Sequence, residues 1–474
     1  MSYQSIMKNI SIHDRVFEAL KKAHDVQPKL NAMVSFIDPT SQLEALKPKD
    51  NTLPLYGIPV VLKDLVNMKD TITTGSSKIL ANYVSPYDAT IVKKLKEAGA
   101  IIIGKASCDT FGMGGTNKTA ATGPVYNPYD LSRMSGGSSG GSAVLVASGV
   151  VPMAIGTDTG DSVRKPAAYS GIVGIKPTYG RISRYGIIPY ASSLDHVGFF
   201  TNNVLDAALT LEILAGRDDL DMTSSQRPVE KYTEACVGNV SGQRFGIISN
   251  VTDAIQNKQT MRQFDDLCQK LKDQGAIITK IHLNDDLMKA MLPTYYVIAN
   301  AEATANHSNL DSLRFGVQVE GKDNEAIMMA SRTEGFGPLL RKRFVIGSYA
   351  LFTENQEIIF RKAQKVRRLI VEDVQKALSS VDCLIAPASG NGAPLIEDSQ
   401  IDLLSSEYLV AENYMAFGNF SGYPSMTVPF GFDGILPLGV NLTCRPFEEG
   451  RMLNLAQGIE DLTGLKDLIC EVKP

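Results

Sequence analysis

Apolar residues follow the period of a helix in some segments of this chain and form continuous runs in others. Residues 11–30 place them at every third or fourth position, which predicts an amphipathic helix. Residues 53–68 (LPLYGIPVVLKDLVNM) contain a continuous apolar run, which predicts a strand followed by a turn. Residues 353–378 predict a helix that opens with a capping box of Thr353 and Gln356 and leads into the strand VDCLIAP.

One helix–strand pattern occurs twice. Residues 89–107 (ATIVKKLKEAGAIIIGKAS) and 264–283 (FDDLCQKLKDQGAIITKIHL) each join an amphipathic helix to an apolar run through a glycine, Gly99 in the first copy. Glycine in that position is typical of a helix end. The predicted apolar stripe of the second helix consists of Phe264, Leu267, Cys268 and Leu271. Two units of helix and buried strand predict a mixed α/β fold.

The chain is long enough to bury a sizeable core. It has 474 residues, of which 44% are hydrophobic and 21% charged, as in an ordinary globular protein. This length allows one large domain or two to three smaller ones. The polar segment 217–232 (RDDLDMTSSQRPVEKY) is predicted to be a surface excursion, without being marked as a domain boundary.

The sequence favours a cytoplasmic protein that does not enter a membrane. Residues 1–20 lack the uninterrupted apolar region of a signal peptide. The longest apolar run, residues 143–155, is broken by Ser148, Gly149 and Pro152. The six cysteines are scattered without the spacing of a zinc site. A formal charge of −4, with no tract of lysine and arginine, argues against nucleic-acid binding by this chain alone.

Two clusters of glycine and serine, GGSSGGS (136–142) and GTDTGDS (156–162), stand out as candidate chemistry. The spacing of a phosphate-binding loop is absent. GGSSG formally fits GxSxG, yet a polar segment precedes it where that motif needs an apolar strand. A glycine-rich packing turn is the simplest alternative. A fourth possibility is a serine nucleophile whose base is not histidine.

Lys63 is the candidate for such a base. It directly follows the apolar run IPVVL, where a lysine is out of place, and it precedes Asp64. Burial favours the neutral amine, which can accept a proton from a hydroxyl. A solvated lysine or an ion pair is the ordinary alternative for a lysine at the end of a strand.

These segments resemble the amidase signature family. The resemblance is carried by GIPVVLKD (57–64) and by the continuous segment 135–200, which spans both glycine–serine clusters. Further segments extend it over nearly the whole chain and favour the branch that forms part of tRNA-dependent amidotransferases: KPTYGRISRYG, YYVIANAEATANHSNLDSLRFG, GSYAL, KAQKVRRLI and LPLGVNLTCRPF. It implies a single domain over residues 1–474, with the signature core at about 53–200. The implied fold is a large mixed central β-sheet covered by helices on both faces.

The resemblance also implies a catalytic triad. Lys63 would be the base, Ser138 the bridging serine and Ser162 the nucleophile. The Gly137–Ser138 peptide would be cis. The backbone N–H groups of Thr159, Gly160, Asp161 and Ser162 would form the oxyanion hole.

The implied reaction is glutamine hydrolysis that supplies ammonia to a partner subunit. Arg343 would bind the substrate carboxylate, Glu412 its ammonium group, and Tyr295, or the adjacent Tyr296, would lie beside it. No cofactor is expected on this chain; a B subunit would bind the misacylated tRNA and use ATP with Mg²⁺, and a small C subunit would brace the pair. A free-standing amidase acting on a small amide and a catalytically silent scaffold are the alternatives.

The chain departs from the family pattern beside the nucleophile. Asp161 stands where the family usually has glycine, and Lys165 where it usually has glutamine. A carboxylate there would oppose a forming oxyanion unless it points away or is paired, and Arg164 and Lys165 are the candidate partners. If Asp161 is paired in this way, changing it to glycine is expected to leave activity similar.

Overall fold

A computed structural model describes residue 3 and residues 11–47, 51–397 and 404–472. Its centre is a mixed sheet of eleven strands formed by the described residues. The order across the sheet is β1 (Met33–Phe36), β3 (Ile101–Ala106), β2 (Pro59–Lys63), β6 (Met153–Asp158), β8 (His196–Thr201), β7 (Val173–Lys176), β12 (Ser425–Asp433), β13 (Leu436–Thr443), β11 (Cys383–Pro387), β9 (Arg244–Ile248) and β10 (Ile277–Ile281). Strands β3, β2 and β6 run parallel, as do β11, β9 and β10, and antiparallel pairs join the two groups.

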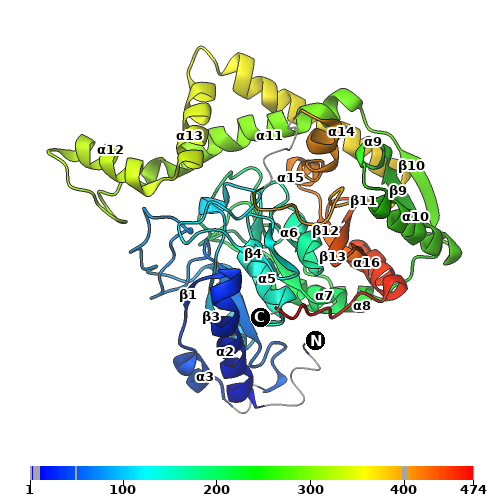
Figure 1. Ribbon diagram of the computed structural model, residues 1–474, viewed down its shortest axis with the longest axis horizontal. Helices are drawn as coiled ribbons and strands as arrows, with labels where there is room; N and C mark the ends of the chain where they lie inside the picture. The colour runs from blue at the N-terminus through cyan, green and yellow to red at the C-terminus, as the bar shows by residue number, and fades with distance from the viewer. Residues whose placement is uncertain (1–2, 4–10, 48–50, 398–403, 473–474) are drawn as a thin grey trace.

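Helices cover both faces of the sheet, as the family resemblance implied (Figure 1). One face packs against α4 (Thr90–Glu97), α7 (Val204–Leu214), α10 (Lys258–Asp273) and α16 (Glu449–Thr463). The other face packs against α2 (Ile12–Leu30), α5 (Gly140–Ala147), α6 (Arg164–Ser170), α14 (Lys362–Ser380) and α15 (Ala416–Ser421).

The alternation of side chains along β2 decides where its lysine points. Val60 and Leu62 belong to the core beneath α4 and α7, whereas Val61 belongs to the core beneath α2 and α5. Successive side chains of a strand point to opposite faces. Lys63 therefore shares the face of Val61 and points toward the segment that leads into α5.

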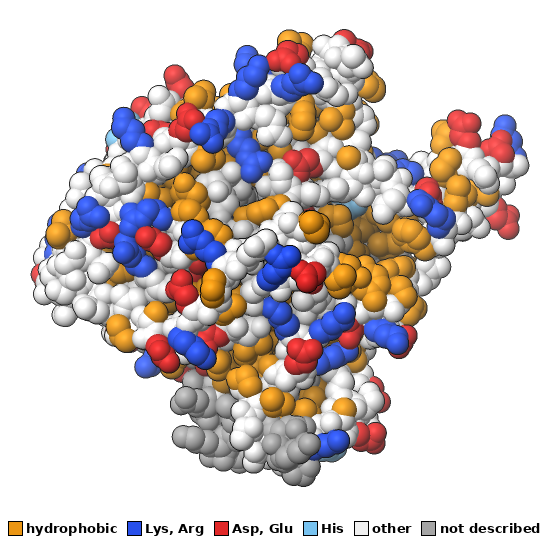
Figure 2. All heavy atoms as spheres, turned by 180° about the vertical axis from the view of Figure 1, so that it is seen from behind, with side chains coloured by type: hydrophobic (Ala, Val, Ile, Leu, Met, Phe, Trp, Pro, Cys, Tyr) orange, Lys and Arg blue, Asp and Glu red, His pale blue; other side chains and the backbone are white. Residues whose placement is uncertain are grey.

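An arm of three helices extends from the sheet layers (Figure 1). It consists of α11 (Asp285–Asn306), α12 (Asn324–Gly335) and α13 (Pro338–Leu351), with α12 at its far end. The remaining elements are α3 (Thr40–Ala45), α8 (Tyr232–Ala235), α9 (Ser249–Ala254), β4 (Tyr126–Asn127), β5 (Asp130–Met134), the 3₁₀ turns η2 (Thr110–Gly112) and η3 (His307–Asn309), and the π-helical turns η4 (Glu357–Arg361) and η5 (Glu407–Ala411). On the face seen in Figure 2, positive and negative side chains are intermixed.

Most of the predicted elements are confirmed. The helix predicted at residues 11–30 runs from Ile12 to Leu30, and its N-cap Ser11 accepts a hydrogen bond from the Asp14 N–H. Both helix–strand units form, as α4 with β3 and α10 with β10, and the predicted stripe of α10 is buried. The segment 217–232 is largely exposed. No helix among the described residues has both the length and the apolar character needed to cross a bilayer.

Two local predictions are wrong. Strand β10 is not buried: it is the last strand of the sheet, so only β9 pairs with it, and Ile277 is 51% exposed. The capping box at Thr353 does not form either. The chain turns between α13 and η4, and the helical segment begins as a π-helical turn at Glu357 without a side-chain cap.

Candidate active site

Lys63 lies at the end of β2, fully buried, and its side-chain nitrogen is surrounded by hydroxyl groups. Lys63 Nζ donates hydrogen bonds to Ser138 Oγ at 2.7 Å, Ser139 Oγ at 2.9 Å and Thr157 Oγ1 at 2.8 Å. These partners come from the segment before α5 and from β6. The structure thus brings the predicted base into contact with the predicted bridging serine. Lys63 makes no ion pair within the described residues.

Burial changes the acidity of this amine. It lowers the pKa of Lys63 to about 8, because the ammonium form loses its hydration in the interior. The negative charges of the Asp109, Asp158 and Asp195 carboxylates oppose that decrease. A lysine with this pKa is neutral in about one molecule in ten at pH 7, and in that form it can accept a proton.

The first glycine–serine cluster presents its serines through an unusual backbone. Gly136 has φ +75°, and a Cβ atom there would lie 2.9 Å from the Tyr169 ring, so a larger residue fits poorly. The Gly137–Ser138 peptide is cis, as the family resemblance implied. The N–H of Ser139 donates to the carbonyl of Ser162 at 3.2 Å, which joins the two clusters.

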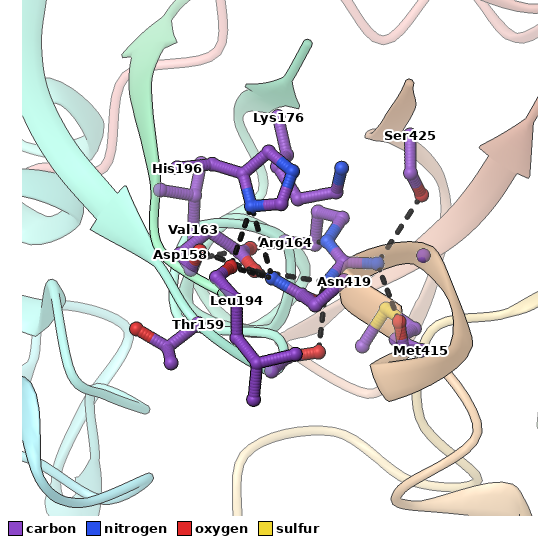
Figure 3. Close-up of polar contacts among 12 residues, drawn as sticks. Asp158, Thr159, Val163, Arg164, Lys176, Leu194, His196, Met415, Asn419 and Ser425 are labelled. Carbon is purple, nitrogen blue, oxygen red and sulfur yellow. Dashed lines mark hydrogen bonds and ion pairs between the residues drawn. The ribbon is translucent and has the colours of Figure 1, made fainter. Parts of the chain in front are cut away.

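A buried ion pair anchors the second cluster from behind. Figure 3 shows Asp158 among its polar contacts. Arg164 donates to both of its carboxylate oxygens at 2.9 and 3.0 Å, and Asn419 donates to Oδ1 at 2.9 Å. Burial alone raises the pKa of Asp158, but the charge and hydrogen bonds of Arg164 outweigh it and hold this pKa far below its usual value. The ends of the loop 159–163 are therefore held firmly.

The same loop exposes a row of backbone N–H groups. Arg164 donates to the carbonyl of Gly160 at 2.7 Å, and the Lys165 N–H donates to the carbonyl of Asp161 at 2.9 Å. In a trans peptide the next N–H points away from the carbonyl. The N–H groups of Asp161 and Ser162 consequently point to the opposite side. Within the described residues, no N–H of residues 159–162 donates a hydrogen bond, which leaves all four available to an oxyanion.

Ser162 lies at the end of that row and is 3% exposed. The described residues include no hydrogen bond between its hydroxyl and that of Ser138, although the neighbouring backbones are joined. Hydrogen bonds between catalytic groups are often long without substrate and shorten in the reacting complex. Of the two contacts that the triad needs, the structure therefore shows the one between Lys63 and Ser138.

The predicted substrate residues gather on the open side of the loop. Gly160 lies against Tyr295, because a Cβ atom on it would be 3.1 Å from the tyrosine ring. Arg343 donates to the hydroxyl of Tyr190 at 3.0 Å, and its guanidinium lies 5.3 Å from the centre of the Tyr296 ring. Arg343 has no carboxylate partner in the described part of the chain. A cationic group with aromatic neighbours and no counter-ion suits a substrate carboxylate.

The expected pairing of Asp161 is wrong. Arg164 pairs with Asp158, and Lys165 donates to Glu412 Oε2 at 2.8 Å. These cations are already occupied, so neither forms an ion pair with Asp161. Glu412, the predicted ammonium ligand, is thus engaged by a lysine of the protein itself.

Several contacts at the site escaped the sequence analysis. Ser139 and Thr157 share the Lys63 nitrogen with Ser138, and Tyr190 orients Arg343. Thr157 and Tyr190 also line a cavity of about 380 Å³. Only Ser139 and Thr157 carried a signal, since both lie within the glycine–serine clusters; nothing marked Tyr190. Among the described residues, no group of three His, Cys, Asp or Glu is arranged to hold a metal ion.

Comparison with known proteins shows the family to which the chain belongs. The sequence model of the amidase family matches residues 14–453, and the chain belongs to the amidase signature family. It is 40% identical to the A subunit of glutamyl-tRNA(Gln) amidotransferase from Koribacter versatilis, with 89% of this chain and 87% of that protein covered. It is 37% identical to the Fusobacterium nucleatum protein of the same name, with 98% and 96% covered.

Solved structures show the same fold. The crystal structure of the A subunit of glutamyl-tRNA(Gln) amidotransferase from Thermotoga maritima is similar with a TM-score of 0.83 and 34% identity, and the match covers 100% of this chain and 98% of that one. A peptide amidase from Stenotrophomonas maltophilia is similar with a TM-score of 0.80 and 26% identity, covering 98% and 94%. The fold alone thus does not choose between a component of a larger enzyme and a free amidase.

Proposed function

We propose that this chain is the glutamine-hydrolysing subunit of a tRNA-dependent amidotransferase, which supplies ammonia to convert Glu-tRNA(Gln) or Asp-tRNA(Asn) to Gln-tRNA(Gln) or Asn-tRNA(Asn). The proposal rests on one contact above all, the hydrogen bond from buried Lys63 to Ser138. The relatives named as the A subunit of glutamyl-tRNA(Gln) amidotransferase are 36–40% identical over nearly the whole chain. They support the amidotransferase component over a free amidase.

The reaction begins with two proton transfers. Neutral Lys63 accepts the proton of Ser138, and Ser138 accepts the proton of Ser162. The Ser162 oxygen then attacks the side-chain amide carbon of glutamine. The pKa of about 8 supports this role, because only the neutral amine can accept a proton.

The oxyanion that forms is stabilised by the N–H groups of residues 159–162. Breaking the C–N bond, with return of a proton to the leaving nitrogen, releases ammonia and leaves a γ-glutamyl ester on Ser162. Water then attacks the ester and gives up a proton through Ser138 to Lys63; glutamate leaves as the serine is protonated again. Loss of one oxyanion donor typically costs about 10²–10³ in rate.

A free amino acid carries one negative and one positive group, and the site offers partners for both. Arg343, with no counter-ion among the described residues, would take the carboxylate, and Tyr295 would pack beside the substrate. Acidic residues near the nucleophile would take the ammonium group. This combination favours glutamine over a neutral amide.

The released ammonia would be used by partner subunits. We propose a cytoplasmic heterotrimer in which a B subunit binds the misacylated tRNA and activates it with ATP and Mg²⁺, while a C subunit braces the assembly. The names of the relatives, each of which is one component of a named amidotransferase, support a multi-subunit enzyme.

Ammonia release from glutamine tests the proposal. The wild type and Ser162→Ala should be compared, each alone and with candidate B and C subunits. We expect release by the wild type, an increase with the partners, and loss of activity in Ser162→Ala. Hydrolysis of other small amides, but not of glutamine, would support a free-standing amidase. Assembly without activity in either variant would support a silent scaffold.

A further inference from the structure

The carboxylate of Glu412 has no hydrogen-bond acceptor position left for a substrate. Its carboxylate accepts hydrogen bonds from Lys165 Nζ at 2.8 Å, the Gly390 N–H at 2.7 Å, the Ser389 hydroxyl at 2.9 Å and the Tyr169 hydroxyl at 3.4 Å. A carboxylate has about four lone-pair positions, so these four donors fill it. The positive charge of Lys165 also neutralises it.

Lys165 cannot readily leave this arrangement. Its three ammonium hydrogens have three acceptors, which are the carbonyl of Ala388 at 2.8 Å, the carbonyl of Glu412 at 2.9 Å and the Glu412 carboxylate. The side chain of Lys165 is only 5% exposed. A substrate ammonium group would have to displace a buried, fully bonded lysine in order to reach Glu412, which is unfavourable.

Asp161 has the opposite character. Its carboxylate makes no hydrogen bond or ion pair with any described residue, although it directly precedes the nucleophile Ser162. Gly160, which directly precedes it, lies against the Tyr295 ring, so residue 161 belongs to the part of the loop beside the aromatic residues. Burial raises the pKa of Asp161 to about 6, and the charge of Lys165 limits the increase, so this carboxylate is ionised above neutral pH.

We infer that Asp161, rather than Glu412, binds the ammonium group of the amino-acid substrate in this protein. The inference rests on the proposed function and assigns the specificity of the same site. Arg343 and Asp161 are then two opposite charges that have no ion-pair partner among the described residues, one for each end of a zwitterion. In glutamine the ammonium nitrogen lies roughly 5 Å from the amide carbon, a separation that the adjacent residues 161 and 162 can span.

The test compares two amides that differ only in the ammonium group. Steady-state kinetics are measured with L-glutamine and with 4-carbamoylbutanoate, which lacks the amino group, on the protein purified with the partner subunits it retains. In Asp161→Asn we expect KM for glutamine to rise by about tenfold to a hundredfold, because a charge-assisted hydrogen bond is lost. KM for 4-carbamoylbutanoate should stay within about twofold.

Glu407→Gln is the matched control. Glu407 is a nearby carboxylate that accepts a hydrogen bond from Asn391, so its neutralisation should change KM for neither amide. If Asp161→Asn does not fold, Asp161→Gly serves instead, with binding of L-glutamate and glutarate measured by calorimetry; selective loss of L-glutamate binding is expected. An unchanged KM for glutamine, or an equal rise for both amides, overturns the inference and leaves the proposed function standing. A wild type that hydrolyses neither amide overturns both.

Discussion

The side-chain nitrogen of Lys63 lies 2.7 Å from the hydroxyl oxygen of Ser138, although seventy-five residues separate them in the chain. Lys63 ends an interior strand, and Ser138 precedes a helix that packs on the same face. The sheet therefore sets the contact between base and hydroxyl, and it holds the amine away from water. Burial and proximity together give a lysine the chemistry that histidine supplies in many other hydrolases.

Replacing Lys63 by methionine should abolish glutamine hydrolysis, because no other basic side chain among the described residues forms a hydrogen bond with the Ser138 hydroxyl. We expect a loss of at least about 10³ in kcat/KM, in the range found when a general base is removed. Ammonia release measures it. Lys105→Met is the matched control: burial lowers the pKa of Lys105 to about 8 as well, but its nitrogen donates to Val66 and Thr73 instead of the serines. Comparable loss per folded molecule in both variants would contradict a specific role for Lys63.

The rate should increase with pH through the pKa of the base. Below about pH 8 most of Lys63 is protonated and cannot accept a proton, so kcat/KM for glutamine should rise about tenfold per pH unit. Above that value the amine is neutral and the profile should level off. Initial rates from pH 6 to 9, where glutamine keeps its ammonium group, give the profile. A rate that is flat from pH 6 to 9 would mean that Lys63 is not the titrating base.

Ser138 and Ser139 provide a comparison between two neighbours that both contact Lys63. Ser138→Ala removes the proposed bridge to Ser162, and we expect a loss of about 10²–10⁴ in kcat. The Ser139 hydroxyl instead donates to the carbonyl of Thr157 at 3.0 Å, which holds the segment in place. Ser139→Ala should therefore cost less activity and mainly stability, of about 1–3 kcal/mol. Kinetics and urea unfolding separate the two effects, and the reverse order of activities would exchange the roles of these serines.

The local elements could be predicted because their signals are local. The periodicity of residues 12–30 and the glycine after α4 each act within a few positions. The sequence could not reveal that β10 is an edge strand, because its apolar residues look the same whether one neighbour or two pair with them. Exposure there depends on the order of strands across the sheet, which long-range contacts decide.

The candidate site shows the same division. The family resemblance indicated Lys63, Ser138 and Ser162, and the structure brings the first two together. The neighbours of Asp161 could not be inferred from the chain order. Arg164 and Lys165 are close in sequence, yet they turn to Asp158 and Glu412, where each finds more hydrogen-bonding partners. Ion pairing in a buried site is a matter of geometry that sequence spacing does not encode.

Stability should depend on pH through Glu460, a carboxyl group that lies 3% exposed on α16. Burial, with help from nearby Asp461 and Asp467, raises the pKa of Glu460 to about 7. The unfolded chain ionises near the ordinary value of about 4.3. A raised folded-state pKa stabilises the protein below the unfolded pKa, and this stabilisation is lost as pH rises through 7. Glutamine cannot ionise. As pH rises from 5 to 8, the free energy of unfolding of Glu460→Gln relative to that of the wild type should therefore increase by about 2–3 kcal/mol.

Urea unfolding of both proteins at several pH values measures this change. The substitution also removes one acceptor, because Glu460 binds both the Val204 N–H and Gln457, but that cost does not vary with pH. Asp382→Asn is the control of opposite sign. Hydrogen bonds from Arg244 lower the pKa of Asp382 to about 2, so its stabilisation is lost only as pH falls through that value. The difference between wild type and Asp382→Asn should stay nearly constant from pH 5 to 8; a constant difference for Glu460→Gln as well would contradict the raised pKa of Glu460.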